Sequence, residues 1–492
     1  MTFSSPLFLF LFLPLFILLN FVIWKRGRNL FLVIISLLFY AWGEPKYILL
    51  LLLSILVNYI ISSRIDDSQR HKNQTGARLW LSAGLTINLG SLAVFKYTDF
   101  LLASSWNWIG SFTGLDFLHL NAPGLPLQLG ISFFTFSAVS YLIDIYRQDA
   151  QHEHHPIYAA LYISFFPKLL AGPIVQYRHM KDKIRSRTIS AEKLTSGIQR
   201  FITGLGKKVL IANTLGMVAD QIFAVFPDQL TAPVSWLGIL CYTLQIYFDF
   251  SGYSDMAIGI AKMAGFDIPE NFNYPYIAQS VREFWQRWHI SLSTWFRDYL
   301  YIPLGGNRCT PERVYINLMV VFLLCGMWHG AGETFLIWGA WHGIFIALEH
   351  AGFGNALKKI PPAFRHLYLI LVVMIGWVIF RSDSLDYAVR YIKTMFGFSP
   401  GIAPVTALGG YLNSLVIFTL LVGIVASLPV VVKIKDLQDK MPIISGIKNS
   451  LHNRIFLLGR SLAELLFLGF ILIVSVLFMS GSLNNPFVYF KF

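Results

Sequence analysis

The sequence predicts an all-α integral membrane protein with many transmembrane helices. Of its 492 residues, 55% are hydrophobic and only 13% are charged, whereas a soluble globular chain usually has about a quarter charged residues. Several apolar runs approach the ~20 residues that a helix needs to cross the hydrocarbon core. The alternating pattern of a membrane β-barrel is absent from the sequence, and helices satisfy their own backbone hydrogen bonds within lipid.

The distribution of charge predicts the orientation. A net charge of +13 does not indicate a nucleic-acid partner, because Lys and Arg lie between apolar runs instead of forming a compact basic domain. Such clusters are expected on the cytoplasmic side. They occupy residues 25–28, 64–78, 178–208, 282–313, 358–365 and 433–460. The three cysteines have neither CxxC nor metal-ligand spacing, so no disulfide or metal site is predicted.

This orientation gives about twelve crossings with both termini outside. The first apolar run lacks a basic region before it and is expected to remain as a helix instead of being cleaved as a signal peptide. Ile157–Ala171 is short, contains Pro167 and has cytoplasmic flanks, so it is predicted to be re-entrant. Without internal repeats or linkers, residues 1–492 are expected to form one membrane domain, with a motif-bearing core at roughly 126–350. The crossings are expected near 6–24, 30–43, 46–62, 79–96, 126–146, 209–226, 236–262, 314–328, 334–350, 367–381, 411–432 and 462–479.

Residues 264–313 do not resemble an ordinary span, because they are polar and aromatic. Their aromatic residues, which include Trp285, Trp288, Trp295 and Phe296, are expected to form an interfacial belt. The polar residues among them are expected to line a hydrated cavity, where buried charges can find partners. These are Arg282, Arg287, His289, Asp298 and Tyr301. Upstream, Asp249 and Asp255 lie within an apolar run and are expected to pair with nearby polar groups.

His329 is the most informative residue. It follows an apolar run of about a dozen residues, which is too short to cross the membrane as a helix, so the imidazole is expected partway through it. A lone histidine in a helix is more often a packing residue, but an ionisable group at membrane depth is a candidate for function. Glycines at 326, 330 and 332 would permit close approach of a ligand or helix. His342 is a weaker candidate of the same kind.

Three segments resemble the membrane-bound O-acyltransferase superfamily: Tyr247–Gly259, Phe284–Gly306 with its Trp-His-Ile-Ser-Leu-Ser-Thr-Trp core, and Met327-Trp-His-Gly. The sequence is most similar to the bacterial branch that contains the alginate O-acetylation membrane subunit. The similarity extends to Phe165-Phe-Pro-Lys-Leu-Leu-Ala-Gly-Pro-Ile and to Asn485-Pro-Phe-Val-Tyr-Phe. The resemblance implies helices around a central tunnel, with His329 as the catalytic histidine and His289 at the second family position.

The resemblance also implies the substrates and the location. The donor would be acetyl-CoA, used as a substrate and not as a tightly bound cofactor, and an imidazole can exchange protons between a hydroxyl and a leaving thiolate. The acceptor would be an exopolysaccharide, with alginate as the leading candidate, reached through a periplasmic SGNH-type acetyltransferase at the bacterial inner membrane. The donor phosphates would meet basic residues at the cytoplasmic mouth. The candidates are Arg282, Arg287, Lys207 and Lys208, together with Arg178 and Lys181.

Other functions remain open. Related enzymes acetylate peptidoglycan or cellulose, or transfer D-alanine to teichoic acid. A polysaccharide transporter would also use many helices around a polar path, but it predicts broken helices in two repeated halves, which the sequence does not show. A scaffold that only anchors a periplasmic enzyme would not explain a histidine inside a span.

Overall fold

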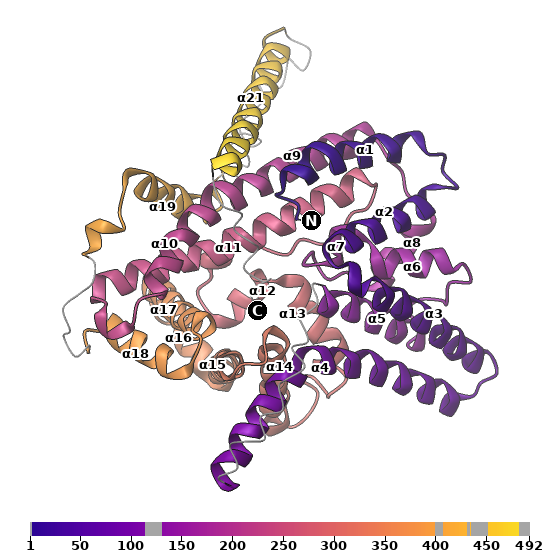
Figure 1. Ribbon diagram of the computed structural model, residues 1–492, viewed down its shortest axis with the longest axis horizontal. Helices are drawn as coiled ribbons and strands as arrows, with labels where there is room; N and C mark the ends of the chain where they lie inside the picture. Colours follow the sequence, from indigo (N-terminus) through magenta and orange to yellow (C-terminus); the bar gives the residue numbers. More distant parts are fainter. Residues whose placement is uncertain (1, 114–129, 399–406, 431–432, 434–450, 482–492) are drawn as a thin grey trace.

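The computed structural model describes residues 2–113, 130–398, 407–430, 433 and 451–481, and every regular element within these ranges is a helix (Figure 1). The all-α prediction is therefore confirmed. Within the same ranges, five helices are long and apolar enough to cross a membrane, and four shorter helices are also apolar. The chain is thus a multi-pass membrane protein, while the number of twelve crossings stays a prediction. The five are Pro45–Arg70, Gln74–Thr98, Pro311–His329, Pro362–Arg381 and Leu458–Gly481.

The N-terminal helices form one side of the molecule. Helices α3 and α4 pack against each other and against α5, and α2 packs against α6 and α7. Asn58 on α3 and Asn88 on α4 exchange two side-chain hydrogen bonds of 3.1 and 2.8 Å in the buried interface. Such pairing satisfies the hydrogen bonds of polar side chains, which lipid tails cannot do. The bounds are α1 Leu13–Val22, α2 Arg28–Gly43, α3 Ile48–Arg70, α4 Gln74–Thr113, α5 Ile131–Tyr146, α6 Pro156–Ser164 and α7 Phe166–Leu169.

The predicted re-entrant segment is an interrupted helix. Phe165 separates α6 from α7 with φ −53° and ψ 108°, and Pro167 occupies the first turn of α7. Proline fits there because the first N–H groups of a helix have no partner within the helix. All residues of α7 are buried, so this broken backbone is enclosed by protein, as broken elements at membrane depth must be.

Helices α9, α10 and α11 run side by side across the molecule, with α9 next to the N-terminal helix α1 (Figure 1). Helix α9 approaches α11 closely, because a Cβ at Gly197 would lie 2.7 Å from the carbonyl oxygen of Gly259. Gly204 and Gly252 meet in the same way. Small residues permit such contact between membrane helices. The bounds are α8 Tyr177–Arg185, α9 Ala191–Gly206, η3 Lys207–Ala212, α10 Asn213–Phe223 and α11 Ala232–Met263.

Helices α12 and α13 lie near the middle of the molecule in Figure 1. The expected interfacial belt of aromatic residues is wrong here, because Trp285, Trp288 and Trp295 are only 7%, 1% and 7% exposed. Trp295 stacks on Phe136 of α5 at 4.0 Å, and Trp288 lies 5.0 Å from Trp377 of α17. Neighbouring helices surround this segment, so its rings fill the protein core. Its bounds are α12 Val281–Arg287, α13 Ile290–Phe296 and η6 Arg297–Tyr301.

Helices α14 and α15 form a tight hairpin beside this centre. Helix α14 begins at Pro311 and ends at His329, and its first turn carries Glu312 and Arg313. The expectation that this segment is too short to cross a membrane is therefore wrong, because the helix extends beyond the apolar run and is long enough to span. Helix α21 projects away from the other helices in Figure 1 and contacts α9 and η3. The remaining bounds are α14 Pro311–His329, α15 Glu333–Leu348, η7 Glu349–Phe353, α16 Gly354–Leu357, α17 Pro362–Arg381, α18 Leu385–Met395, α19 Ser414–Ala426 and α21 Leu451–Gly481.

Candidate active site

His329 is the last residue of α14 and is 5% exposed. Its ring is enclosed by aromatic rings from three helices. The centroids lie 4.8 Å from Trp328, 5.0 Å from Trp338 on α15 and 5.3 Å from Phe380 on α17, all in edge-on geometry. The imidazole therefore has a dry, rigid surrounding, as expected for a group that must act away from bulk water.

Two of the three glycines around His329 permit helix packing. A Cβ at Gly326 would collide with the carbonyl oxygen of Phe335, and a Cβ at Gly330 would collide with the Phe335 ring. Gly339 on α15 meets α14 equally closely. A Cβ at Gly332 would make only ordinary contacts, the nearest at 3.6 Å. The expectation of close approach is thus confirmed for a helix at two positions, which fixes the end of α14 against α15.

His289 also lies near Trp328. It is completely buried, and its ring centroid is 6.1 Å from Trp328 and 4.6 Å from Phe250 of α11. Its Nδ1 is 3.1 Å from Oδ1 of Asn271. Since Trp328 contacts both His289 and His329, the two sequence-predicted histidines occupy one site.

Helix α4 fastens the end of α14. The Lys96 ammonium donates to the carbonyl oxygen of Trp328, and the Tyr97 hydroxyl donates to that of Met327. These carbonyls belong to the last turn of α14, where no backbone N–H is available to them and positive charge is favourable. Lys96 Nζ also lies 5.8 Å from the centroid of the Trp328 ring. Lys96 therefore lies close enough to His329 to interact with it electrostatically.

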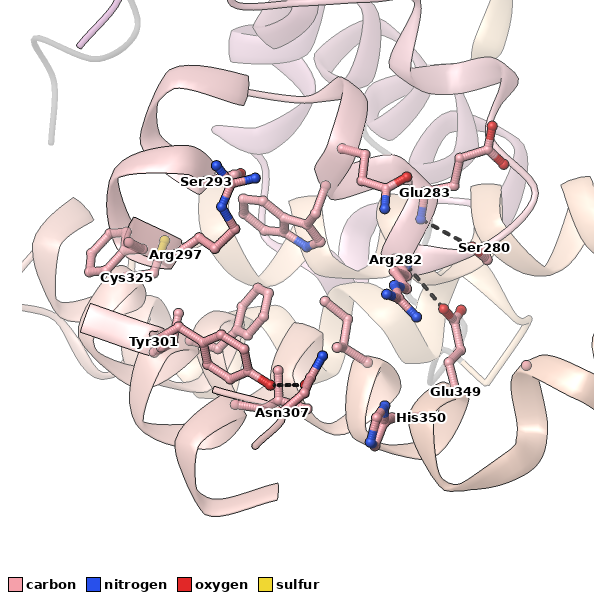
Figure 2. Close-up of a pocket in the computed structure, with 18 of the residues that line it drawn as sticks. Ser280, Arg282, Glu283, Ser293, Arg297, Tyr301, Asn307, Cys325, Glu349 and His350 are labelled. Atoms are coloured by element: carbon pink, nitrogen blue, oxygen red, sulfur yellow. Dashed lines mark hydrogen bonds between the residues drawn. The ribbon is translucent and has the colours of Figure 1, made fainter. Parts of the chain in front are cut away.

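A pocket of about 730 Å³ opens beside the histidines, between α12, α13, α14 and the end of α15 (Figure 2). Glu349 holds one wall in place, because its carboxylate accepts hydrogen bonds from the backbone N–H groups of Val281 and Arg282 at 2.7 and 3.0 Å. Figure 2 shows Arg282 on this wall and Arg297 with Tyr301 across the cavity. Four lysine and arginine residues line the pocket, Arg282, Arg297, Lys358 and Arg365, against two glutamates, Glu283 and Glu349.

The apolar part of the pocket leads toward His329. Its lining follows α14 through Leu318, Val321 and Phe322 to Cys325, which is one turn, or about 6 Å of helix rise, before His329. Trp285 also lines the pocket, and its ring lies 5.8 Å from that of Trp338, which contacts His329. One layer of aromatic rings thus separates the pocket from the catalytic candidate.

The other predicted phosphate ligands lie elsewhere. Arg287 bonds to Glu283 at 2.9 Å and does not line the pocket. Lys207 pairs with Asp255 at 2.7 Å, and Lys208 pairs with Asp249 at 2.6 Å, between η3 and α11. The structure therefore brings Arg282 to the pocket but not these three, and it confirms that Asp249 and Asp255 pair with neighbouring polar groups.

A carboxylate centre joins α5, α8 and η6. Asp144 accepts from the Tyr299 hydroxyl at 2.7 Å and the Arg178 N–H at 2.9 Å. Asp298 accepts from Arg178 at 2.8 Å, as well as from Gln176 and Arg297. Burial by itself would raise the pKa of Asp298, but these hydrogen bonds and the two guanidinium charges outweigh it and hold the pKa below its ordinary value.

Several residues of the site were missed by sequence reasoning. Asn271, Lys96 and the pocket residues Arg297, Lys358 and Arg365 come from segments far apart in the chain. Lys358 and Arg365 belong to one predicted cytoplasmic cluster and Arg282 and Arg297 to another, so charge clustering was the available signal. For Asn271 and Lys96 the sequence offered none, because neither belongs to a charge cluster.

The fold and the site define a multi-pass membrane enzyme with a buried histidine pair beside a basic pocket. The chain belongs to the membrane-bound O-acyltransferase (MBOAT) family, whose model matches residues 73–395. It is similar to the probable alginate O-acetylase AlgI of Pseudomonas aeruginosa, with 46% identity over 81% of this chain and 75% of that protein. It is also similar to the peptidoglycan O-acetyltransferase of Helicobacter pylori, with 38% identity over 80% of each chain.

A more distant relative is the teichoic acid D-alanyltransferase of Bacillus subtilis, with 32% identity over 42% of this chain and 55% of that protein. All three relatives are named for the transfer of an acyl group. The chain is therefore an acyltransferase, and the resemblance recognised in its motifs is confirmed.

Proposed function

We propose that this protein takes acetyl groups from cytoplasmic acetyl-CoA and passes them across the bacterial inner membrane for O-acetylation of an extracytoplasmic polysaccharide, with alginate as the favoured polymer. The observation that carries the proposal is the pocket of Figure 2. It combines four basic residues with an apolar wall that ends one helical turn before His329. Basic groups suit the phosphates of a CoA thioester, and an apolar path suits its uncharged arm.

The position of the pocket agrees with a cytoplasmic donor. Its basic residues come from residues 282–313 and 358–365, both of which charge bias assigns to the cytoplasm. Arg282 is therefore proposed as a donor-binding residue, with Arg297, Lys358 and Arg365 beside it. Arg287, Lys207 and Lys208 remain candidates from sequence, but their ion pairs and their distance from the lining make them weaker ones.

The relatives favour acetyl over D-alanyl transfer. Both O-acetyl-transferring relatives align over four-fifths of this chain, and the D-alanyltransferase aligns over 42% of it. Alginate is favoured over peptidoglycan because identity is 46% against 38%. A polysaccharide transporter is disfavoured, since the family's activity is transfer and the buried histidines serve chemistry better than passage of a polymer.

The proposed chemistry is direct acyl transfer. The acceptor oxygen attacks the thioester carbonyl carbon, His329 takes the hydroxyl proton, the carbon–sulfur bond breaks, and the proton passes to the leaving thiolate of CoA. The acyl group leaves on the acceptor, so atoms and charge balance without an added oxidant or metal. A second protein, an SGNH-type acetyltransferase in the periplasm, is proposed to carry the acetyl group onward to the sugar.

Reconstitution in sealed vesicles tests the proposal. Labelled acetyl-CoA is supplied on the cytoplasmic face, and the periplasmic partner is supplied on the other face with alginate or, in a parallel assay, with peptidoglycan fragments. Label should reach the partner or the polymer with the wild-type protein and should stay behind with His329→Ala. Transfer that requires acetyl-CoA on the outer face would contradict the proposed transfer across the membrane. Label on peptidoglycan fragments but not on alginate would show that the acceptor is peptidoglycan.

A further inference from the structure

His289 has an unusual backbone conformation that its neighbours hold in place. Its φ of 43° and ψ of 52° lie in the left-handed region, which is rarely adopted by residues other than glycine. The segment 271–273 lies against it: Ile290 N–H donates to the Asn271 carbonyl at 2.9 Å, and Asn273 N–H donates to the Arg287 carbonyl at 2.9 Å. Strain of this kind persists only where the surroundings enforce it, and it is common at functional sites.

The Asn271 amide can be oriented without ambiguity. One of its terminal atoms lies 3.2 Å from the backbone nitrogen of Ser291, which can only donate. That atom must therefore be the oxygen, Oδ1, although amide oxygen and nitrogen are often hard to distinguish. The Nδ2 group then donates to Ser254 of α11 at 3.0 Å. The amide is thus held from both ends.

This orientation determines the tautomer of His289. The same Oδ1 lies 3.1 Å from Nδ1 of His289 and also accepts from the Ser291 hydroxyl at 2.8 Å. Since an amide oxygen cannot donate, Nδ1 must carry the proton. In the neutral imidazole Nε2 then has the free lone pair. Within the residues that the structure describes, this buried Nε2 has no hydrogen-bond partner.

We propose that Asn271 is a positioning residue that holds His289 as the Nδ1–H tautomer, so that Nε2 of His289 is the hydrogen-bond acceptor offered to a substrate hydroxyl or water beside Trp328 and His329. This inference rests on the proposed acyl-transfer function. The two histidines then have different roles. His289, oriented by Asn271, accepts a hydrogen bond from the acceptor hydroxyl, and His329 exchanges the proton. Among the described residues, His329 on α14 interacts electrostatically with His289, and Lys96 on α4 interacts with His329.

Two substitutions of Asn271 separate positioning from packing. Asn271→Leu keeps the volume but removes the acceptor, and it should lower the acetyl-transfer rate by about 10²-fold, the lower end of what a general acid–base group contributes. The KM for acetyl-CoA should change little. Asn271→Asp keeps an acceptor and adds negative charge, which stabilises the imidazolium. It should therefore restore much of the rate and move the pH–rate profile to higher pH.

Ser291→Ala is the matched control, because it removes another hydrogen bond to the same Oδ1, together with the one that the Ser291 hydroxyl accepts from the Ile174 N–H, and leaves the contact of Oδ1 with the imidazole in place. If Ser291→Ala lowered the rate as much as Asn271→Leu, or if Asn271→Asp left the pH–rate profile unchanged, the positioning role would be wrong. Melting temperatures identify any variant that fails to fold.

The tautomer can also be measured without any transfer reaction. In ¹⁵N NMR spectra of the histidine-labelled protein, with His289 assigned by a His289→Gln variant, Nδ1 should carry the proton and Nε2 should not. Asn271→Leu should show a mixture of tautomers. A wild-type protein with the proton on Nε2 would overturn the inference, whatever the activity. The expected tautomer in a protein that does not transfer acetyl groups would instead count against the proposed function.

Discussion

The carboxylate centre and the histidine centre of this protein are both polar and buried, but they differ in how their groups are satisfied. In the carboxylate centre, Asp144 accepts two hydrogen bonds and Asp298 accepts three. In the histidine centre, Nε2 of His289, both ring nitrogens of His342 and the indole nitrogens of Trp285, Trp328 and Trp338 lack partners among the described residues.

The two carboxylates are thus paired, although Oε1 of Gln176 and Nε of Arg178 beside them also lack partners among the described residues, whereas in the histidine centre the ring nitrogens themselves are unpaired. Leaving a buried donor or acceptor unpaired costs about 1–3 kcal/mol, so native proteins rarely do so without a reason. The His342 ring lies 5.3 Å from Trp285 and 5.2 Å from Trp338, between the pocket and His329. Substrate or water entering from the pocket would meet these unpaired groups first.

The largest expected effect is that of His329→Ala. Loss of the imidazole should lower acetyl transfer by about 10²–10⁴-fold, the usual contribution of a general acid–base group. The variant should still fold, because the substitution removes one ring from an aromatic cluster whose other members, Trp328, Trp338 and Phe380, remain. Turnover of labelled acetyl-CoA measures the transfer rate, and thermal unfolding in detergent measures stability. His71→Ala, which removes an exposed histidine at the end of α3, is the control; equal activity of the two variants would end the catalytic assignment.

Arg282→Ala should weaken donor binding. A charge-assisted hydrogen bond contributes about 1.5–3 kcal/mol, so the KM for acetyl-CoA should rise roughly 10- to 100-fold while kcat changes less. Arg287→Ala is a matched control on the same helix, because Arg287 bonds to Glu283 and does not line the pocket. If Arg287→Ala raised KM more than Arg282→Ala, the donor would bind outside this pocket.

Asp298→Ala should destabilise the protein, and any effect on acetyl transfer should arise through Arg297, which pairs with Asp298 and lines the pocket. The substitution leaves Arg178, Arg297 and Gln176 without their shared acceptor, which should cost about 1–3 kcal/mol in the free energy of unfolding. Asp267→Ala, which breaks an exposed pair with Lys193, should cost about 0–1 kcal/mol. Unfolding curves compare the two, and similar losses would show that the carboxylate centre does not brace the fold.

The smallest expected effect is the acid sensitivity of the same centre. Because the pKa of Asp298 is lower in the folded protein than its ordinary 3.8, ionised Asp298 stabilises the fold above that value, and the stabilisation is lost as pH falls through the folded pKa. Between pH 5 and pH 3, the melting temperature of the wild type should fall more than that of Asp298→Asn. Equal losses would assign the acid sensitivity to other groups.

The sequence by itself predicted that the protein lies in lipid, that its secondary structure is helical, and that His329 is the candidate catalytic residue. A scarcity of charge over long apolar runs permits only helices in lipid, and a histidine with flanking glycines in an apolar run identified His329. The pairing of Asp249 and Asp255 also followed, since carboxylates in apolar helices need partners.

Tertiary structure alone decided what surrounds these residues. The tryptophans of α12 and α13 have the composition of an interfacial belt, but α5 and α17 enclose them. Asn271 reaches His289 only because a loop folds back onto the start of α13, and the basic pocket forms only where two distant clusters meet. Sequence periodicity reports the environment of one helix, whereas a site depends on contacts between residues far apart in the chain, and these exist only after packing.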